Sequence, residues 1–270
     1  MLDDTSLASC IYIGIGHMGR PVFEATNRYF LGNGWRILAV DRDPEKLKGL
    51  PAMTDARAPR HGTLAIVGIR PQDFPALREE AITAEVIVSM MAGISGDSLQ
   101  AAFPDAQIIR IIPNTPCAFG VGMTPIYVRP RAKPSARISE ILTGIGCMGP
   151  LLHVAQEDMI DKATGVSAGG PAYCMHVAGA MIAAAESMGF APSDARLLVA
   201  QTLRGSAELL LRTDRAPEQL AREVMTPNGT TERGIEALCQ HDVAKSIHEA
   251  LLAASQRASD LSASVVGVDR

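Results

Sequence analysis

The sequence has few aromatic residues, no excess of basic residues and no closely paired cysteines. Phe, Trp and Tyr make up 4% of its 270 residues, and 25 Lys+Arg stand against 29 Asp+Glu, a net charge of −4. Without an excess of basic residues, nucleic acids and anionic membranes are poor partners. The five cysteines are odd in number, widely spaced and contain no Cys-x-x-Cys pair, which indicates reduced thiols and argues against disulfides or a zinc site.

The sequence also lacks a recognisable signal peptide and a membrane-length apolar run. Its first four residues, Met-Leu-Asp-Asp, do not form the basic start that precedes the apolar run of a signal peptide. The most apolar stretch, residues 177–185, is too short to cross a bilayer. Hydrophobic residues make up 47% of the chain and charged residues 20%, which excludes disorder. We therefore expect a soluble cytoplasmic protein with a sizeable core.

Residues 1–155 show a pattern of short apolar runs rich in Val and Ile, separated by turn residues. Helical candidates lie between some of these runs, at residues 17–31 and 96–103. Alternation of strand and helix at this spacing predicts an α/β domain with a doubly wound parallel sheet and helices on both faces. The expected strands cover residues 10–14, 36–41, 63–69, 85–90 and 107–112.

Residues 156–270 have the apolar spacing of helices and predict a second, all-helical domain. Long helices are expected at residues 171–189, 193–211 and 242–257. The first of them is small and apolar on nearly every side, which predicts that it is buried. A domain of only about a hundred residues covers such a helix poorly by itself. We therefore expect a second subunit to cover it.

Residues 11–19, Ile-Tyr-Ile-Gly-Ile-Gly-His-Met-Gly, read as a strand, a Gly-x-Gly-x-x-Gly turn and a helix start. Gly14 allows the tight turn, Gly16 lets backbone amides approach a pyrophosphate, and Gly19 packs the helix against the strand. The helix N-terminus adds partial positive charge for the phosphates. Asp41 follows 22 residues beyond Gly19, at the end of the next strand. The pattern predicts a Rossmann-type dinucleotide site.

Two adjacent residues give opposite indications of which dinucleotide binds. Asp41 stands where a carboxylate would accept hydrogen bonds from the adenosine ribose, which favours NADH. Arg42 could instead meet a 2′-phosphate, which favours NADPH. The sequence leaves the choice between NADPH and NADH open.

The histidines do not form a pattern typical of metal ligands, and we expect no metal. His17 lies inside the glycine turn, where flanking the cofactor or capping the helix is a more usual role than catalysis. The other five are not spaced as a ligand set would be. They are His61, His153, His176, His241 and His248.

Three further stretches are too polar and glycine-rich to form core. They are residues 110–116 (Arg-Ile-Ile-Pro-Asn-Thr-Pro), 164–173 (Thr-Gly-Val-Ser-Ala-Gly-Gly-Pro-Ala-Tyr) and 224–231 (Val-Met-Thr-Pro-Asn-Gly-Thr-Thr). The last two are expected at helix N-termini, which suit a small anion such as a carboxylate. Helix capping by Ser or Thr alone is the alternative explanation.

With these stretches in this order, the sequence resembles the pyrroline-5-carboxylate reductases, the last enzymes of proline biosynthesis. The resemblance covers nearly the whole chain. It also includes Gly-Ile-Arg-Pro-Gln at residues 68–72, Ser-Met-Met-Ala-Gly-Ile at 89–94 and Glu-Asp-Met-Ile-Asp-Lys-Ala-Thr-Gly at 157–165. The resemblance implies reduction of a carboxylate-anchored cyclic imine by hydride from NADPH or NADH. It also implies a homodimer built on the helical domain, with larger rings of dimers in many members.

The resemblance also implies roles for individual residues. Thr231 would place its hydroxyl on the ring nitrogen as the catalytic residue. The substrate would lie on Gly229, Thr230 and Thr231, beside Glu157. The expected cofactor-binding residues are Gly14, Ile15, Gly16, His17, Met18, Gly19, Asp41, Arg42, Ile69, Arg70, Pro71, Met91, Ala92, Gly93 and Asn114.

Several positions depart from the family's usual pattern. Ala168 and Gly169 interrupt its Gly-Ser pair, Arg70 replaces a lysine, Asn228 a glycine and Cys239 a glutamate. Arg70 keeps a cation near the cofactor, and Asn228 tolerates left-handed backbone. Two alternatives therefore stay open: a reductase of a different cyclic imine acid, and a non-catalytic dinucleotide-binding regulator. The β-hydroxyacid dehydrogenases, which need a lysine on a Gly-x-x-x-Lys turn, fit poorly.

Overall fold

The computed structural model describes residues 7–52, 61–80 and 82–266, with side chains up to residue 260. The chain forms two compact units. The first contains Met1–Pro171 and Ala253–Arg270, and the second contains Ala172–Leu252.

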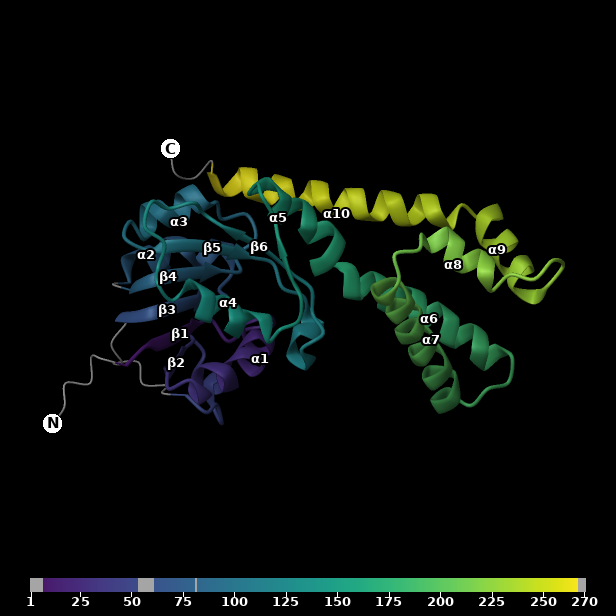
Figure 1. The fold of residues 1–270 in the computed structure, drawn as a ribbon, viewed down its shortest axis with the longest axis horizontal. Helices are drawn as coiled ribbons and strands as arrows, with labels where there is room; N and C mark the ends of the chain where they lie inside the picture. The colour runs from purple at the N-terminus through teal and green to yellow at the C-terminus, as the bar shows by residue number, and fades with distance from the viewer. Residues whose placement is uncertain (1–6, 53–60, 81, 267–270) are drawn as a thin grey trace. The chain divides into compact units, whose positions relative to one another are not determined.

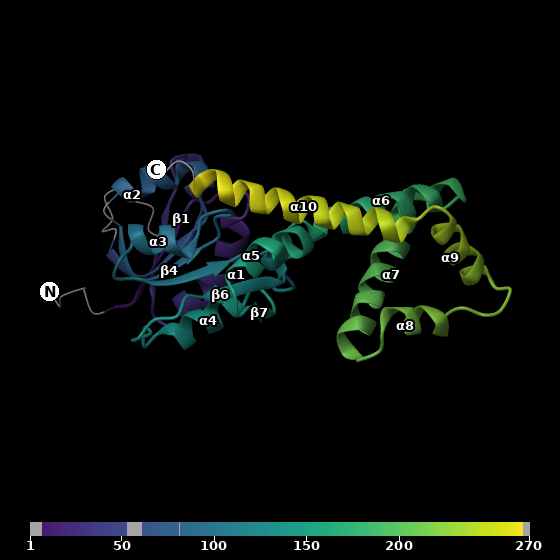
Figure 2. The ribbon, with the colours of Figure 1, turned by 90° about the horizontal axis from the view of Figure 1, so that it is seen from above.

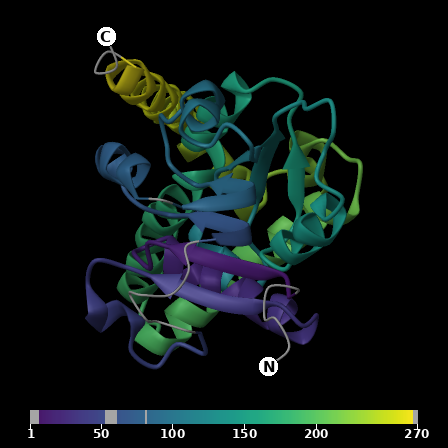
Figure 3. The same ribbon diagram turned by 90° about the vertical axis from the view of Figure 1, so that its left-hand side faces the viewer.

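The first unit is built on a seven-stranded sheet with the order β2-β1-β3-β4-β5-β6-β7 (Figures 1 and 3). Strands β1 to β5 pair in parallel, β6 runs antiparallel to β5, and β7 runs parallel to β6. Because β1 has β2 on one side and β3 on the other, the strand order reverses at β1, where doubly wound sheets bind their ligands. The strands are β1 (Ser9–Ile13), β2 (Arg36–Val40), β3 (His61–Val67), β4 (Thr83–Ser89), β5 (Gln107–Ile111), β6 (Thr124–Val128) and β7 (Leu151–His153).

Helices cover both faces of this sheet, because successive strand residues point to opposite sides and both sets are apolar. On one face, Tyr12 of β1 packs with Phe23 and Phe30 of α1. On the other face, Ile13 of β1 packs with Leu77 and Leu99. The doubly wound architecture is confirmed. The helices of this unit are α1 (Gly19–Gly32), α2 (Phe74–Glu79), α3 (Gly96–Ala102), α4 (Ile138–Gly146), α5 (Asp158–Ala163) and the end of α10 (Val243–Val266), with 3-10 turns η2 (Pro44–Leu47), η3 (Pro71–Asp73) and η4 (Thr115–Phe119).

The five free cysteines differ in reactivity because two of them lie in the core. Cys10 and Cys117 are fully buried, whereas Cys147, Cys174 and Cys239 are exposed. Burial raises the pKa of the Cys117 thiol to about 11 and that of Cys10 still further, because it disfavours the thiolate. We therefore expect at most three thiols to react with a thiol reagent in the native protein at neutral pH, and all five after unfolding. Modification of Cys10 without unfolding, detected by mass spectrometry, would contradict this assignment.

The second unit consists of helices and has almost no core of its own. It contains α7 (Pro192–Arg212), α8 (Pro217–Glu223) and α9 (Thr230–Gln240), with most of α6 (Gly170–Ser187) and the start of α10 (Val243–Val266) (Figure 2). Within residues 172–252 only Ala178, Ala195 and Val199 are buried. The expected burial of α6 is therefore not provided by this chain, which leaves Met175 and Val177 exposed.

None of the described helices combines the length and apolar character needed to cross a membrane.

Candidate functional site

A cleft of about 700 Å³ opens at the carboxyl ends of β1 to β4, next to the point where the strand order reverses. Its volume is typical of cofactor sites. Many of the residues that the sequence assigned to cofactor binding come together here. They are Gly14, Gly16, His17, Met18, Asp41, Arg42, Ile69, Arg70, Pro71, Met91 and Ala92.

The glycine-rich turn has the close contacts that require glycine. Gly14 has a φ of +87°, in the left-handed region, and its amide donates to the Val40 carbonyl at 2.8 Å. A Cβ atom on Gly19 would overlap the carbonyl oxygen of Gly14, so α1 can begin against the end of β1 only with glycine there. The tight turn expected at Gly14 and the close packing expected at Gly19 are confirmed.

Backbone donors in this turn remain available to a ligand. A Cβ atom on Gly16 would meet nothing within 4 Å, so the backbone is open on the cleft side. Among the described residues, no protein oxygen accepts from the amides of Gly16, His17 and Met18. Free amides in front of the 14-residue helix α1 form the arrangement that binds phosphate. The turn therefore fits the pyrophosphate of a dinucleotide.

Asp41, directly after β2, forms hydrogen bonds within the protein through both carboxylate oxygens. Oδ2 accepts from the Ile15 amide at 2.7 Å, which connects the end of β2 to the glycine-rich turn. Oδ1 accepts from the Asp43 amide at 2.9 Å and lies 3.5 Å from Nζ of Lys46. The Asp41 side chain is only 8% exposed. It therefore restrains the turn, whatever else it contacts.

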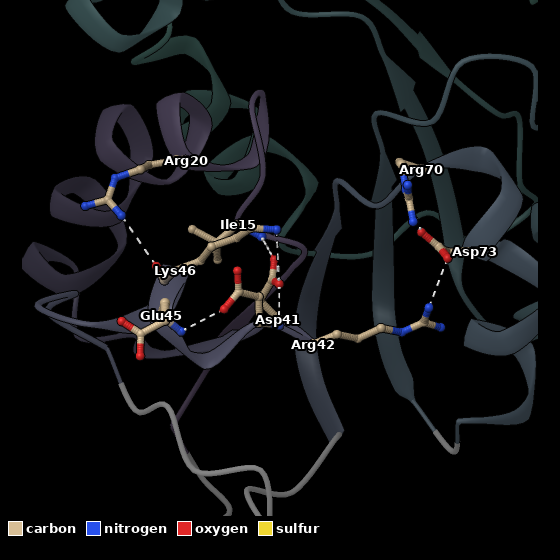
Figure 4. A network of polar contacts seen from close by, with 9 residues as sticks. Ile15, Arg20, Asp41, Arg42, Glu45, Lys46, Arg70 and Asp73 are labelled. Atoms are coloured by element: carbon tan, nitrogen blue, oxygen red, sulfur yellow. Dashed lines mark hydrogen bonds and ion pairs between the residues drawn. The ribbon is translucent and has the colours of Figure 1, made fainter.

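Two arginines at the rim of the cleft share one carboxylate, as Figure 4 shows. Nη1 of Arg42, after β2, lies 2.9 Å from Oδ1 of Asp73, and Nε of Arg70, after β3, lies 3.1 Å from Oδ2. Arg42 and Arg70 are 65% and 81% exposed, and Asp73 is 21% exposed. One carboxylate thus holds two largely solvent-exposed guanidinium groups next to each other.

Glu157 does not line this cleft and instead forms a buried ion-pair cluster in the same unit. The side chain of Arg110, on β5, is 3% exposed. Its Nη1 donates to Oε1 of Glu157 at 2.7 Å, and its Nη2 donates to Oδ1 of Asp161 at 3.0 Å. The Gly96 amide, at the start of α3, also donates to Glu157, at 2.6 Å. Glu157 therefore joins β5, α3 and α5.

Asn114 connects two segments through its side-chain amide, and it also lies outside the residues that line the cleft. Its Oδ1 accepts from the Met123 amide at 2.9 Å, and its Nδ2 donates to the Ser167 carbonyl at 3.1 Å. Ser167 belongs to the π-helix η5 (Thr164–Ala168), a rare conformation that is frequent at functional sites. Gly93, with a φ of +80°, lies in the turn after β4, one residue beyond the lining residue Ala92.

The stretch at residues 164–173 differs from the expected helix start. Helix α5, η5 and α6 follow one another with only Gly169 between the last two, and the Gly169 amide donates to the Thr164 carbonyl at 3.2 Å. The expectation of an anion-binding N-terminus here is wrong, because the chain enters α6 from a preceding helical turn. Gly165 has a different purpose: a Cβ atom there would lie 2.7 Å from the Ser255 amide nitrogen of α10.

The stretch at residues 224–231 does form a helix start with free donors. Asn228 has a φ of 59°, which confirms that it adopts the left-handed backbone expected of it. Its amide donates to Oε2 of Glu232 at 2.6 Å, and a Cβ atom on Gly229 would overlap Thr226. Among the described residues, neither the amides nor the hydroxyls of Thr230 and Thr231 have a protein partner. This start of α9, in the second unit, fits a carboxylate.

Sequence reasoning missed several residues that line the cleft. Lys46 and Asp73 are charged groups on the short turns η2 and η3, and no motif covers them. The proximity of Asp73 to Arg70 in the sequence is a weak signal, because i,i+3 pairs are common on protein surfaces. Met90 and Gly68 also line the cleft, and a Cβ atom on Gly68 would lie 2.5 Å from Cε of Met90.

Comparison with known proteins gives the relatives of this chain. Residues 157–261 match the family of the pyrroline-5-carboxylate reductase dimerisation domain. The pyrroline-5-carboxylate reductase of Synechocystis sp. is 34% identical over 176 residues, which cover 65% of each chain. That of Thermus thermophilus is 30% identical over 257 residues, which cover 93% of this chain and 97% of the relative.

The fold agrees with a solved structure that carries a dinucleotide. Plasmodium falciparum pyrroline carboxylate reductase with NADP bound has a TM-score of 0.82 and 19% identity, over 94% of this chain and 98% of that one. At this identity the match establishes the fold alone. The 30% identity to the Thermus thermophilus enzyme extends over nearly the whole of both chains. This match shows that the chain belongs to the pyrroline-5-carboxylate reductase family.

Proposed function

We propose that this protein is an NAD(P)H-dependent reductase that converts the C=N bond of 1-pyrroline-5-carboxylate into the C–N bond of L-proline. The observation that carries the proposal is the combination of an open glycine-rich turn on the cleft with a threonine-rich helix start whose donors are free. A dinucleotide sensor has no need of the second feature. Residues 1–155 form the dinucleotide-binding domain, and residues 156–270 form the domain for dimerisation and substrate.

The cofactor is held by the residues of the cleft and of the turns beside it. The amides of Gly16, His17 and Met18 bind the pyrophosphate at the start of α1, and Ile15 and Gly19 fix the shape of the turn. Residues 69–71 and 91–93 enclose the cofactor from β3 and β4. Asn114 holds η5 in place near the end of β5 through its bond to Ser167.

The substrate carboxylate binds at the start of α9, on the amides of Gly229, Thr230 and Thr231. Helix α9 has 11 residues, and the partial positive charge at its N-terminus favours a carboxylate. The hydroxyl of Thr231 orients the ring nitrogen. Glu157, in the first unit, is the other residue assigned to the substrate, and its carboxylate holds the start of α5 to β5 and α3. The free donors at the start of α9 and the family relationship support this assignment of the substrate site.

The reaction requires little acid–base chemistry from the protein. When bound, the reduced nicotinamide supplies a hydride from C4 to the imine carbon. If the imine binds as the protonated iminium, its nitrogen keeps that proton and the product is the neutral secondary amine. The residues of this chain then act mainly by fixing the reacting carbon in position.

The quaternary structure that fits this chain is a homodimer built on the second unit, with rings of dimers as the larger assembly. Support comes from the dimerisation family that matches residues 157–261. It also comes from the small number of buried residues in the second unit, which is three. A unit of this size needs far more buried apolar surface to be stable. The apolar residues of α6 and α7, among them Met175, Leu197 and Leu198, supply it to a partner copy. The five free cysteines fit the cytoplasm.

The experiment that tests the function is steady-state oxidation of NADPH and NADH by the purified full chain, with and without 1-pyrroline-5-carboxylate. We expect oxidation that depends on the imine. Binding of the cofactor without turnover would reject 1-pyrroline-5-carboxylate as the substrate. A panel of other cyclic imine acids would then separate a different reductase, which turns one of them over, from a regulator, which turns over none.

A further inference from the structure

The loop between β4 and α3, residues 90–95, lines part of the cleft. Met90, Met91 and Ala92 face it, and α3 begins at Gly96. The glycine-rich turn after β1 fits the pyrophosphate, and the adenosine ribose is expected beside the end of β2. Because the strand order is β2-β1-β3-β4, the nicotinamide half of a dinucleotide is left with the ends of β3 and β4. The position of this loop therefore bears on where the hydride donor lies.

The loop has few hydrogen bonds beyond its first two residues. The Met90 amide donates to a carbonyl of β3 at 2.9 Å, and the Met91 amide donates to a side chain of β4 at 3.2 Å. The amides of residues 92–95 have no protein acceptor in the described part of the chain. Ile94 is buried, so its side chain holds the middle of the loop. The next backbone donor after this gap is the Gly96 amide.

Glu157 binds that amide and so holds the far end of the loop. Its Oε1 accepts from the Gly96 amide at 2.6 Å and from Nη1 of Arg110 at 2.7 Å. A Cβ atom on Gly96 would lie 2.9 Å from Oε2 of Glu157, so the carboxylate approaches the backbone more closely than a larger residue would allow. Arg110 also donates to Asp161, which fixes the guanidinium and, with it, the carboxylate of Glu157.

We infer, taking the cleft as the dinucleotide site of the proposed function, that Glu157 is a positioning residue for the nicotinamide half of the cofactor. It acts as a hydrogen-bond acceptor that fixes the β4–α3 loop through the Gly96 amide, and not as a negative charge beside the substrate iminium. A bond from a backbone amide to a carboxylate is among the stronger hydrogen bonds, and here it restrains a loop whose own amides are free. A loop that is ordered in advance loses less entropy when the cofactor binds.

The charge of Glu157 is already offset within the protein. The side chain of Arg110 is 3% exposed and lies 2.7 Å from the Glu157 carboxylate, whose side chain is 25% exposed. An opposite charge at this distance reduces the attraction that the carboxylate exerts on a cation elsewhere. The bond to Gly96 needs only an acceptor oxygen, so the two roles can be separated by substitution.

The test measures dissociation constants by titration calorimetry on the full chain for NADPH and for 5′-AMP, which lacks the nicotinamide half. Glu157→Ala should weaken NADPH about tenfold, the contribution of one hydrogen bond to a charged group, and leave 5′-AMP within about twofold. Glu157→Gln keeps an oxygen that can accept from the Gly96 amide and should recover most of the NADPH affinity. Equal weakening of both nucleotides, an unchanged NADPH constant, a loss in Glu157→Gln as large as in Glu157→Ala, or no NADPH binding by the parent protein would overturn the inference.

Two further variants exclude a general loss of stability. Gly96→Ala keeps every charge and introduces a better helix former, but its Cβ displaces the Glu157 carboxylate from the amide. It should weaken NADPH selectively while its thermal stability stays close to that of the parent, and it decides the inference should Glu157→Ala fail to fold. Asp97→Ala removes a carboxylate that is 84% exposed, one residue further along α3, and should change neither constant. An unchanged NADPH constant in Gly96→Ala, or a loss in Asp97→Ala equal to that in Glu157→Ala, would contradict the inference.

Steady-state kinetics separate this role from a substrate contact. At saturating NADPH, Glu157→Ala should lower kcat, because a misplaced hydride donor slows the transfer, and leave KM for 1-pyrroline-5-carboxylate within about twofold. Loss of a substrate contact would instead raise KM. A raised KM with unchanged NADPH binding would refute the inference and leave the function intact. Selective loss of NADPH affinity in a protein whose parent does not turn over the imine would refute the function and leave the inference intact.

Discussion

Replacing Thr231 with alanine is expected to lower kcat/KM for 1-pyrroline-5-carboxylate about a hundredfold, the loss typical of a small misplacement of the reacting groups. Thr231 lies in the first turn of α9, exposed and with a hydroxyl that has no protein partner among the described residues. The proposed role of that hydroxyl is to orient the ring nitrogen, so its removal should leave the imine bound but poorly aligned. Steady-state kinetics at saturating cofactor measures the effect.

Two controls make the Thr231 result specific. Thr231→Ser keeps a hydroxyl at the same position and should recover most of the activity. His17→Ala removes an exposed side chain that lines the cleft, and should cost far less activity. A larger loss in His17→Ala than in Thr231→Ala would show that the chemistry depends on the glycine-rich turn. Because Thr231 is exposed, the thermal stability of both Thr231 variants should match that of the parent protein.

Replacing Arg110 with methionine is expected to lower the free energy of unfolding of the first unit by about 3 kcal/mol, the lower end of the range for removing one partner of a buried ion pair. The guanidinium of Arg110 is buried between Glu157 and Asp161, and its loss leaves two carboxylates close together without a cation. The lower value applies because both carboxylates keep some contact with solvent. Urea unfolding, followed by fluorescence of the chain's single tryptophan, Trp35, reports on this unit.

The matched control for Arg110 is Arg129→Met. Arg129 pairs with Asp97, which is largely exposed, so the loss should stay below about 1 kcal/mol. Equal effects of the two replacements would contradict the assignment of Arg110 as the residue that joins β5 to α5. A smaller loss in Arg110→Met than in Arg129→Met would also contradict it.

The strands of the sheet were largely predictable, and the exceptions have identifiable causes. The five expected strands correspond to β1–β5, because a parallel sheet covered on both faces needs nearly continuous apolar runs. Strand β6 was missed because Pro125 interrupts its pattern, and β7 because it has only three residues. The length of α10 was underestimated, since it continues beyond residue 257 to Val266.

The composition of α6 predicts that the helix is covered, but it does not predict which chain covers it. A helix that is apolar on nearly every side must be covered, but composition does not say by which chain. In the structure, Ala178 is the only residue that α6 buries within its own chain. The prediction of a covered helix therefore points outside the chain, to the copy expected from the dimerisation family.

The site was predictable wherever backbone geometry dictates residue type. Gly14, Gly19 and Asn228 were identified because a left-handed or closely approached backbone restricts which residues fit. The side-chain partners were not predictable in the same way. The bond from the Ile15 amide to Asp41 joins residues 26 positions apart, and nothing in their types distinguishes it from a bond between Asp41 and a ribose.

The shortage of buried residues in the second unit has a consequence for how the protein comes to be folded. With three buried apolar side chains between residues 172 and 252, this unit cannot gain enough hydrophobic free energy within one chain to offset its loss of conformational entropy. Its folding is then a second-order process whose rate depends on how often two chains meet. The yield of folded protein should therefore rise with the concentration of newly made chains.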